Sequence, residues 1–514
     1  MENNMNQEAV YDAAVLGKGK MFVLGLQHLF AMFGATVLVP AITGLNVSTT
    51  LLFAGLGTLL FHWVTGRKVP AFLGSSFAFL GAYGLTTASG QNIPLTYSGF
   101  GVAVAGMMYL VLALMFKIFG TKKVMSFFPP IVTGPVIICI GLTLAGTAIN
   151  NAAQNWGIAL VAIAIVVVCN IWGKGMIKIS GTKKAMSFFP PNVTGPVIIC
   201  IGLTLAGTAI TSCTSNWLVA LVAIVVVVVA NIWGKGMIQI VPILLGVVAS
   251  YLVAMVVDPA ARAAVAATVA EAKWFGLPII WEETALSIFN KDLDVSMLIT
   301  AVITIAPISL ATIVEHVGDM CAISSTVGKN YVADPGLHRT LVGDGLATAV
   351  SSLFGGPANT TYGENTGVLA LSKVYDPKVV RLAAVFAMVL SFCPKFAALI
   401  VAMPAATMGG VSLVLYGMIS SVGVRNVVEN QVDFTKSRNV LIAALIMGLA
   451  IGIKYYDVSG AITFNLGPVA VSLSGLAVAA VVGIVLNAVL PGKDYEFGTN
   501  PQGDTAVNFG SRQK

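Results

Sequence analysis

The chain has 514 residues; 57% of them are hydrophobic, 10% are charged, and the formal net charge is +7. No water-soluble core can bury so large an apolar fraction, and the apolar runs repeatedly reach the roughly 20 residues that span a bilayer. This composition excludes a soluble globular protein and predicts an all-α protein that crosses the membrane many times.

About sixteen apolar runs are candidate spans. The first follows Lys18 and Lys20 and lacks a small-residue cleavage site, so we expect a span rather than a cleaved signal. A mixed-charge segment, 258–294, is expected to be a loop or short surface element outside the membrane. The candidate spans lie near 21–42, 48–66, 70–89, 98–119, 130–149, 156–173, 191–210, 217–233, 238–257, 295–316, 341–355, 362–374, 380–403, 409–422, 439–456 and 468–491.

One stretch of the chain is duplicated in tandem. Residues 120–179 recur as 181–240 without a gap, and roughly four positions in five are identical. Each copy holds two apolar stretches behind a Phe-Phe-Pro-Pro motif, so the repeated unit is predicted to be a helical hairpin. Because two crossings return the chain to the side it started from, an inserted hairpin leaves the orientation of all later spans unchanged.

The placement of basic residues predicts the orientation of the chain. The turns at 43–48 and 86–94 carry no basic residue, and neither do the turns inside the two hairpins, whereas the intervening turns are basic. This alternation is the positive-inside pattern, which places both termini in the cytoplasm of a cell-membrane protein, and no nucleic-acid partner is expected. The first basic turns contain Arg67 and Lys68, Lys117 to Lys123, Lys174 to Lys184, and Lys235.

The sequence shows no pattern of residues for catalysis or metal binding. The six cysteines lie within or beside apolar runs and have no metal-ligand spacing, so they are interpreted as packing residues. No nucleophile and base pairing or phosphate loop is present. We therefore expect neither an enzyme nor a bound metal or cofactor.

Two candidate spans differ from the rest. The runs at 70–89 and 362–374 open with small or polar residues, Gly74-Ser75-Ser76 and Asn359 to Gly363, before they become apolar. Interrupted helices in corresponding places of two halves mark the binding site in many transporters. The N-terminus of each half-helix would present free N–H groups and a positive dipole end near the middle of the membrane.

Three groups of polar residues lie within predicted spans, where an acidic residue costs about 2.5–3.5 kcal/mol. Glu315 and Glu364 are predicted to bind substrate or carry protons rather than form a structural pair. Asp319 lies one turn beyond Glu315 on the same face, and is either part of that site or a solvated residue at the helix end. His28 is interpreted as an internally bonded residue that supports the site. The groups are Gln27 and His28; Glu315, His316 and Asp319; and Glu364 and Asn365.

Five motifs between Met21 and Pro491 are specific in combination. They are Leu-Gly-Leu-Gln27-His28-Leu-Phe, Pro-Ala-Phe-Leu-Gly-Ser75-Ser76-Phe77-Ala-Phe, Glu315-His316-Val-Gly-Asp319, Asn359-Thr-Thr-Tyr362-Gly363-Glu364-Asn365-Thr-Gly367, and Gly409-Gly410-Val-Ser-Leu-Val-Leu-Tyr416-Gly417. Together they resemble the nucleobase-ascorbate transporter family, and its uracil permease branch in particular. Only the surplus hairpin interrupts the resemblance.

The resemblance implies a fold of fourteen spans, arranged as two inverted seven-helix repeats, with broken strand-helix segments in spans 3 and 10. A core domain would hold the substrate and a gate domain would move against it. Copy two of the hairpin is assigned to gate spans 5 and 6, because it runs directly into the seventh span through Gln239 to Pro242. The implied divisions are an N-terminal tail (1–20), the first core half (21–119), hairpin copy one (120–180), copy two (181–240), gate span 7 (241–257), an outer loop (258–294), the second core half (295–403), the second gate half (404–491) and a C-terminal tail (492–514).

The resemblance also implies residue roles. Glu315 and Glu364 would hold the N–H groups of the base, Phe77 would pack on its ring, and the backbone at Gly363 and Tyr416 would lie nearby. The site would be supported by Gln27, His28, Ser76, Tyr362 and Asn365. The Glu364-Asn365 pair is similar to the pyrimidine branch, whereas purine-transporting members more often carry Gln-Asn or Pro-Asn there.

Two departures from the family pattern bear on the mechanism. Asp319 stands where uracil permeases of the family carry a His thought to take part in proton coupling, which leaves Asp319, Glu315 and His316 as candidate proton carriers. The motif after Asn365 ends in Ser372-Lys373 instead of Thr and a basic residue, and a mild effect is expected because a hydroxyl is retained.

The expected function is proton-coupled uracil import by alternating access. The expected partners are uracil, a proton, membrane lipid and a second copy of the chain, in a homodimer through the gate domain. The alternatives are a purine or xanthine carrier, a channel or anion carrier, and a uracil-binding protein whose transport is impaired by the extra hairpin. An anion carrier would be expected to have a basic residue at the interrupted helices, and Glu364 argues against that.

Overall fold

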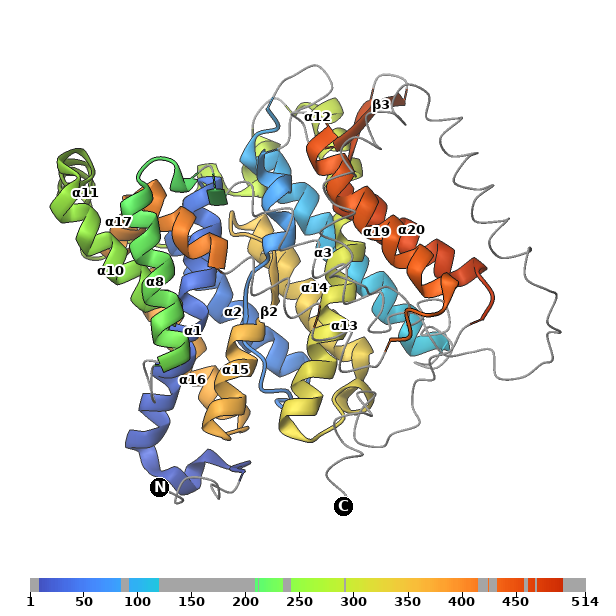
Figure 1. The fold of residues 1–514 in the computed structure, drawn as a ribbon, viewed down its shortest axis with the longest axis horizontal. Coiled ribbons are helices and arrows are strands. Elements are labelled where there is room, and N and C mark those ends of the chain that lie inside the picture. The colour runs from blue at the N-terminus through green and yellow to red at the C-terminus, as the bar shows by residue number, and fades with distance from the viewer. Residues whose placement is uncertain are drawn as a thin grey trace.

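The computed structural model describes residues 9–84, 92–119, 209–210, 212–233, 242–290, 293–414, 424, 432–456, 461–466 and 469–492. The described part of the chain is mostly helical (Figure 1). Copy one of the hairpin and most of the first helix of copy two lie outside it, as do the candidate spans at 130–149 and 156–173 and almost all of the one at 191–210.

The described residues of the first half, up to Phe119, form a short 3-10 turn, three long helices and one broken segment. Its elements are η1 (Ala13–Leu16), α1 (Gly17–Thr43), α2 (Val47–Val64), β1 (Leu73–Ser75), η2 (Phe77–Gly84) and α3 (Leu95–Phe119). The middle of the chain follows with α8 (Trp217–Trp233), α10 (Pro242–Val257), α11 (Pro259–Glu271), η3 (Trp281–Glu283) and η4 (Ala285–Asn290).

The second half repeats the pattern of long helices around a broken segment. Its elements are α12 (Val295–Ile305), α13 (Ile308–Val327), the π turn η5 (Val332–Gly336), α14 (Leu337–Leu353), β2 (Asn359–Thr361), α15 (Gly363–Ser372), α16 (Pro377–Ser391), α17 (Pro394–Val401), an apolar helix at Ala405–Val414, α19 (Ser437–Tyr456), β3 (Ala461–Leu466), β4 (Val469–Ser474) and α20 (Gly475–Val489).

The structure agrees with a membrane-spanning fold. Within the described ranges, five helices are long and apolar enough to cross a bilayer, and two bent pairs raise this to seven if each pair is one span. One bent pair is α10 and α11, which meet at 112°. The bend lies at Asp258, whose carboxylate accepts hydrogen bonds from the first amides of α11, and at Pro259, which begins that helix. The segment from 258 onward begins with α11, most of whose residues are exposed.

Three predicted spans have different bounds in the structure. The run at 380–403 is two helices, α16 and α17, that meet at 88° because Pro394 has no N–H and begins a new helix. The run at 468–491 begins as strand β4, which pairs antiparallel with β3 before α20 starts. The run at 295–316 breaks at Pro307 and then continues as α13 to Val327, beyond the acidic residues where its apolar character fades.

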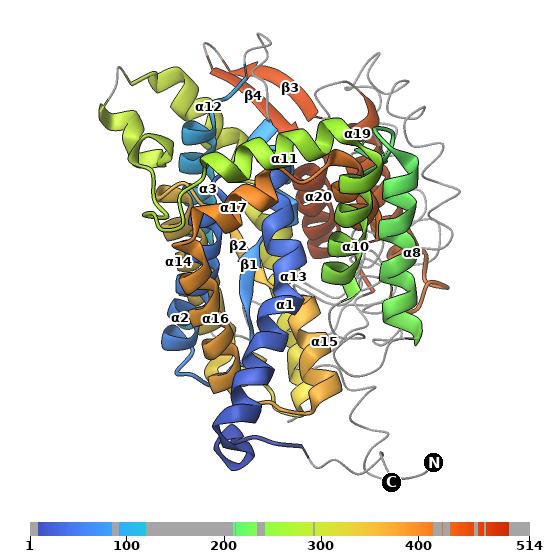
Figure 2. The ribbon, with the colours of Figure 1, turned by 90° about the vertical axis from the view of Figure 1, so that its left-hand side faces the viewer.

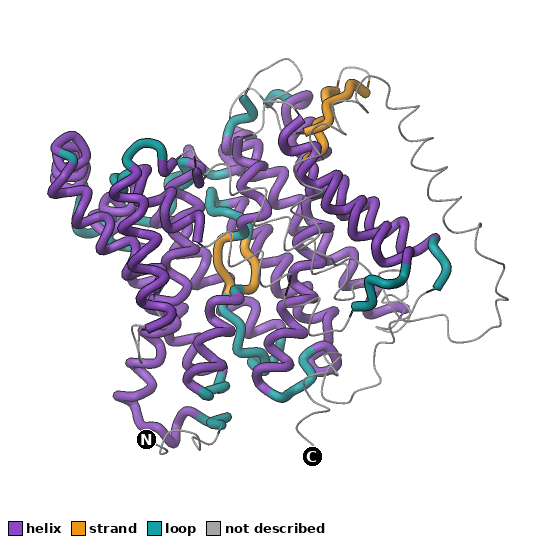
Figure 3. The backbone as a smooth tube through the Cα atoms, in the orientation of Figure 1, coloured by secondary structure: helices purple, strands orange, loops and turns teal. Residues whose placement is uncertain are grey.

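The broken segments lie among the helices rather than at the edge of the molecule. In Figure 2, helices α8, α10, α19 and α20 lie toward one side and α2, α3, α12, α14 and α16 toward the other, and Figure 1 separates the pair α8 and α10 from the pair α19 and α20. In the same view α1, α13, α15 and the paired strands β1 and β2 lie toward the middle, and Figure 3 shows this strand pair enclosed by helices in the middle of the molecule. The broken segments thus lie in the interior of the described part of the molecule.

The second helix of hairpin copy two, α8, packs closely on its neighbours. A Cβ atom added at Gly246 of α10 would lie 2.3 Å from Val227 Cγ2, and one added at Gly410 would lie 2.4 Å from the Ala220 carbonyl oxygen. A Cβ at Gly409 would lie 2.5 Å from the Cys213 amide nitrogen. Only glycine fits at these positions. The backbones of α10 and of the helix Ala405–Val414 therefore lie in close contact with α8 and the residues just before it.

Candidate functional site

The two broken segments cross at the centre of the molecule. Strands β1 and β2 pair antiparallel, with Leu73 opposite Thr361, Gly74 opposite Thr360 and Ser75 opposite Asn359. Each strand leads into a short helix, η2 after β1 and α15 after β2. The sequence prediction that both spans are broken is therefore correct, and α15 begins directly after the buried strand β2 and the buried Tyr362.

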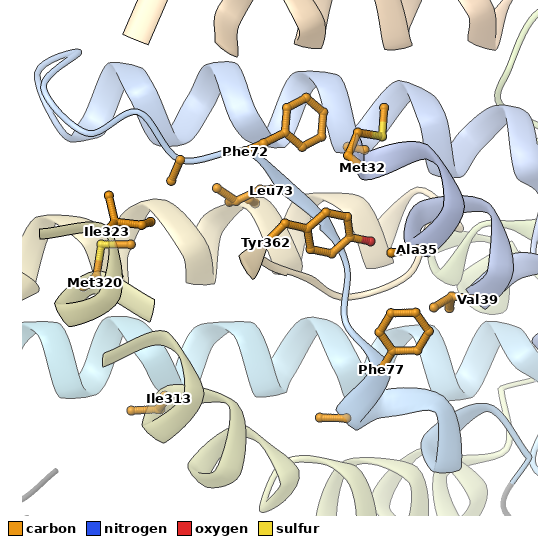
Figure 4. Packing of buried hydrophobic residues seen from close by; sticks show 14 of the residues in the cluster. Met32, Ala35, Val39, Phe72, Leu73, Phe77, Ile313, Met320, Ile323 and Tyr362 are labelled. Atoms are coloured by element: carbon orange, nitrogen blue, oxygen red, sulfur yellow. The ribbon is translucent and has the colours of Figure 1, made fainter. Parts of the chain in front are cut away.

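Tyr362 holds the crossing against α1. Its hydroxyl accepts a hydrogen bond from Thr36 Oγ1 at 3.2 Å and donates one to the Ser75 carbonyl at 3.1 Å, and Ser75 Oγ donates to the Thr36 carbonyl at 3.0 Å. The ring lies over Gly74, where a Cβ would be 2.5 Å from it. Figure 4 shows Tyr362 between Leu73 and Phe77, with its hydroxyl directed toward α1. Tyr362, predicted to support the site, thus locks the first broken segment to the second.

The acidic residues of α13 approach the same crossing. Asp319 is only 9% exposed, and its Oδ2 accepts a hydrogen bond from Thr361 Oγ1, the last residue of β2, at 2.7 Å. The alternative that Asp319 is a solvated residue at a helix end is therefore wrong, because α13 runs on to Val327. Glu315, one turn earlier on the same face, is half-buried.

His28 and Asn365 link α1 to the first turn of α15. Both are buried, and Asn365 Nδ2 lies 3.1 Å from His28 Nδ1 and donates to the His28 carbonyl at 3.0 Å. Tyr362 provides no side-chain cap to α15, so none of the α15 first-turn amides is bonded by its N-cap residue. Gly363 begins the helix, is exposed, and a Cβ added there would meet no atom within 4 Å.

His316 has a partner that the sequence analysis did not identify. Its Nδ1 lies 3.0 Å from Asp344 Oδ2 of α14, and both side chains are fully buried. The Phe61 ring packs against the imidazole in a T-shaped arrangement, with 6.3 Å between ring centroids. A lone acidic residue inside the predicted span at 341–355 was the signal that would have found Asp344.

Of the remaining predicted site residues, some are described by the structure and others lie outside the described part. Phe77 and Ser76 are buried at the start of η2, the Ser76 amide donates to the Ala358 carbonyl at 2.8 Å, and Gln27 is half-buried on α1. Tyr416 and the side chain of Glu364 lie outside the described part; the backbone of Glu364 is in the first turn of α15. Among the described residues, no group of three or more His, Cys, Asp and Glu is arranged to hold a metal ion.

A polytopic helical membrane protein with two crossed, interrupted helices and buried acidic residues beside them has the layout of a transporter. The chain belongs to the xanthine/uracil permease family: the model described as "Permease family" matches residues 19–172 and 153–459. The two matches overlap within hairpin copy one, in keeping with a chain that carries repeated sequence there. Membership of this family makes the chain a transporter and not an enzyme.

Named relatives resemble the chain over nearly its whole length. The uracil permease of Bacillus caldolyticus is 37% identical over 92% of this chain and 93% of its own, and that of Escherichia coli (strain K12) is 36% identical over 91% and 90%. The putative pyrimidine permease RutG of Escherichia coli is 33% identical over 92% and 89%.

Two solved structures align with low scores. The transmembrane domain of the cyanobacterial bicarbonate transporter BicA gives a TM-score of 0.46 at 15% identity, covering 94% of this chain and 99% of its own. SLC26A9 gives a TM-score of 0.49 at 12% identity, covering 93% and 67%. These scores are too low to carry an inference.

Proposed function

We propose that the chain imports uracil together with a proton, and that the strand crossing is its substrate site. The observation that carries the proposal is the convergence of α13 and α15 on this crossing, with Asp319 bonded to the last residue of β2. The relatives named uracil permeases support uracil as the substrate. Uracil is a flat ring with alternating N–H donors and carbonyl acceptors, which carboxylates, backbone amides and an aromatic face can bind together.

In the proposed complex, Glu315 and Glu364 accept hydrogen bonds from the N–H groups of the base. Phe77 packs on the ring, and the backbone at Gly363 and Tyr416 lies beside it. The open space at Gly363 leaves room for a ligand to approach the main chain. Gln27, His28, Ser76, Tyr362 and Asn365 hold these groups in place; the His28–Asn365 and Tyr362–Thr36 contacts support that assignment.

The proton is carried by a carboxylate of α13 in this proposal. Asp319 and Glu315 lie on one face of the helix beside the crossing, whereas His316 is enclosed and already bound to Asp344, which makes it the least suited of the three candidates. A potential of 100 mV supplies about 2.3 kcal/mol per charge, which corresponds to roughly fiftyfold accumulation for one-to-one symport. That is sufficient to collect a scarce solute.

Alternating access would move a gate domain against a core domain. The helix contacts recur in matching pairs: α1 with α10 and α13 with α20, and likewise α2 with α16 and α14 with α3. Such pairing is expected of two inverted seven-helix repeats. The proposed core comprises 21–119 and 295–403, and the proposed gate comprises 181–257 and 404–491, with both termini in the cytoplasm.

Hairpin copy two is the one we assign to the gate. The support is the contact of α8 with α10 and with helix Ala405–Val414, both of which belong to the proposed gate. Copy one is then the surplus hairpin, placed at the lipid-facing periphery or at a homodimer surface. Distances from labels at Asn155 and Asn216 to α10 test this assignment; a shorter distance from Asn155 would reverse it.

Uptake of radiolabelled uracil into proteoliposomes tests the proposed function. The full chain, a variant lacking 120–180 and the Glu364→Gln variant are compared at several external pH values. We expect an acidic external pH to stimulate uracil uptake by the full chain and by the variant lacking 120–180. The Glu364→Gln variant should take up no uracil. Uptake unchanged by Glu364→Gln would reject the site, and binding without accumulation by the full chain would indicate that the extra hairpin prevents transport. If unlabelled xanthine or another purine competed more strongly than unlabelled uracil, the substrate would be that purine and not uracil.

A further inference from the structure

A short segment before α1 bonds to the ends of three helices. We call residues Val10 to Ala13 the N-terminal clamp. The Val10 amide donates to the Lys373 carbonyl at 2.9 Å, and the Tyr375 amide donates to the Val10 carbonyl at 2.8 Å, so the clamp forms a parallel bridge with the chain that leaves α15. Part of the segment predicted as an N-terminal tail is therefore bonded to the rest of the chain, and α1 itself begins at Gly17.

Tyr11 connects the clamp to the end of α13. Its hydroxyl donates a 2.8 Å hydrogen bond to the Val327 carbonyl, one of the last four carbonyls of α13, which have no partner within the helix. The Tyr11 ring packs on Tyr375 with 5.5 Å between centroids, and Lys329 Nζ lies 4.6 Å from its centre. One side chain thus touches both the end of α13 and the segment after α15.

Asp376 connects the clamp to the start of α16. It is the N-cap of that helix: Oδ1 accepts from the Lys378 amide at 2.9 Å, and Oδ2 accepts from the Ala13 amide at 2.8 Å. The carboxylate is almost fully buried. The nearby ion pair between Lys378 and Asp12 is exposed, so it contributes little, and the backbone bonds and the Tyr11 ring hold the clamp in place.

The helix that depends most on such support is α15. It has ten residues, which is too short for a helix to be stable by itself, and its N-cap residue offers no side-chain bond. Its position therefore depends on the bonds of Asn365 to α1 and on what holds its two ends. Strand β2 holds the first end, and at the last end Lys373 has left-handed backbone geometry and its carbonyl accepts the Val10 amide.

We infer that the N-terminal clamp positions α15 relative to α13, and that Val10 and Tyr11 are thereby positioning residues for the substrate site between these helices. The inference rests on the proposed function for its substrate, but the clamp contacts do not depend on it. Both helices belong to the proposed core domain. The clamp therefore fixes the distance between Glu315 of α13 and Glu364 of α15 without restraining the motion of the core domain against the gate domain.

Val10→Pro tests the inference, because it removes the N–H that binds Lys373 and leaves the Val10 carbonyl in place. Ala9→Pro is the matched control: Ala9 is exposed, and its amide makes no hydrogen bond among the described residues. Tyr11→Phe removes only the hydroxyl and is the milder second variant. Hydrogen exchange of the 363–376 amides and the KM and maximal rate of uracil uptake are measured for all four proteins in lipid nanodiscs and proteoliposomes.

We expect Val10→Pro and Tyr11→Phe to speed exchange in 363–376 and to raise KM, each by roughly two- to tenfold as for the loss of one hydrogen bond, with the maximal rate per folded transporter within about twofold. Ala9→Pro should match the unmodified chain. Unchanged exchange, or faster exchange with an unchanged KM, overturns the inference. If the unmodified chain takes up no uracil, the proposed function fails, and exchange alone then decides whether the clamp holds α15.

Discussion

Gly74→Ala is the substitution whose effect on the crossing is clearest from the structure. The added Cβ would lie 2.5 Å from Cε2 and Cζ of Tyr362 and 2.7 Å from its hydroxyl oxygen. Carbon atoms pack at about 3.5–4.0 Å, so the ring must move by about 1 Å. Tyr362 is 4% exposed, and that movement would break its bonds to Thr36 and Ser75. Overpacking costs about 1–3 kcal/mol and each lost bond about 1 kcal/mol, so we expect a loss of about 3–5 kcal/mol.

Thermal unfolding of the purified protein in detergent, followed by size exclusion, measures this loss. Gly367→Ala is the matched control, because a Cβ there meets no atom within 4 Å. We expect Gly74→Ala to unfold at a temperature several degrees lower and to lose uracil uptake, while Gly367→Ala behaves like the unmodified chain. If the two variants were equally stable, the Tyr362–Gly74 contact would not hold the broken segments together.

Four further substitutions test the stability of the fold or its role in transport. Gly363→Ala should keep or slightly raise stability, since its Cβ meets no atom within 4 Å, but abolish uptake by filling space beside the base; normal uptake would exclude substrate from this backbone. Gly410→Ala should lower the unfolding temperature by forcing α8 away, whereas Gly448→Ala, with open space around it, should not; equal stability would argue against the α8 contact. Asp319→Asn keeps an acceptor for Thr361, so stability should persist while the response of uptake to external pH is lost; a preserved pH response would leave Glu315 as the proton carrier.

Much of the fold follows from the amino-acid sequence because apolar length and small-residue interruptions are local signals. The runs Gly74 to Ser76 and Asn359 to Gly363 were sufficient to predict two broken spans, and both are broken in the structure. Their pairing with each other was not predictable, because three-residue strands carry almost no periodic signal and their register is set by the helices that enclose them.

Errors in the bounds arose where an apolar run and a helix end at different residues. The predicted span at 295–316 ends at the first acidic residues, yet α13 continues to Val327, and Asp319 within it is bonded to Thr361 of another segment. The alternation in Val469 to Ser474 is typical of a strand, but the uninterrupted apolar run that follows concealed it. In the run at 380–403, Pro394 marked a break that length alone did not reveal.

Part of the site depends on contacts between residues that lie far apart in the sequence. The sequence placed Glu315, His316 and Asp319 on one helix, but it could not show that His316 is bound to Asp344 while Asp319 approaches β2. Likewise, Tyr11 has no local feature that distinguishes it, and its importance comes from the ends of α13 and α15 that meet there. Such partners lie far apart in sequence, and only the folded chain brings them together.

Direct titration of uracil binding in lipid nanodiscs tests the central claim, which is that two acidic side chains beside the crossed strands hold the base. The unmodified chain is compared with Glu315→Gln and with Glu364→Gln, because each change keeps the shape of the side chain but replaces a charged acceptor. We expect the unmodified chain to bind and each variant to bind roughly tenfold or more weakly, as for a lost hydrogen bond to a charged group. Binding of uracil by both variants with unchanged affinity would contradict the claim.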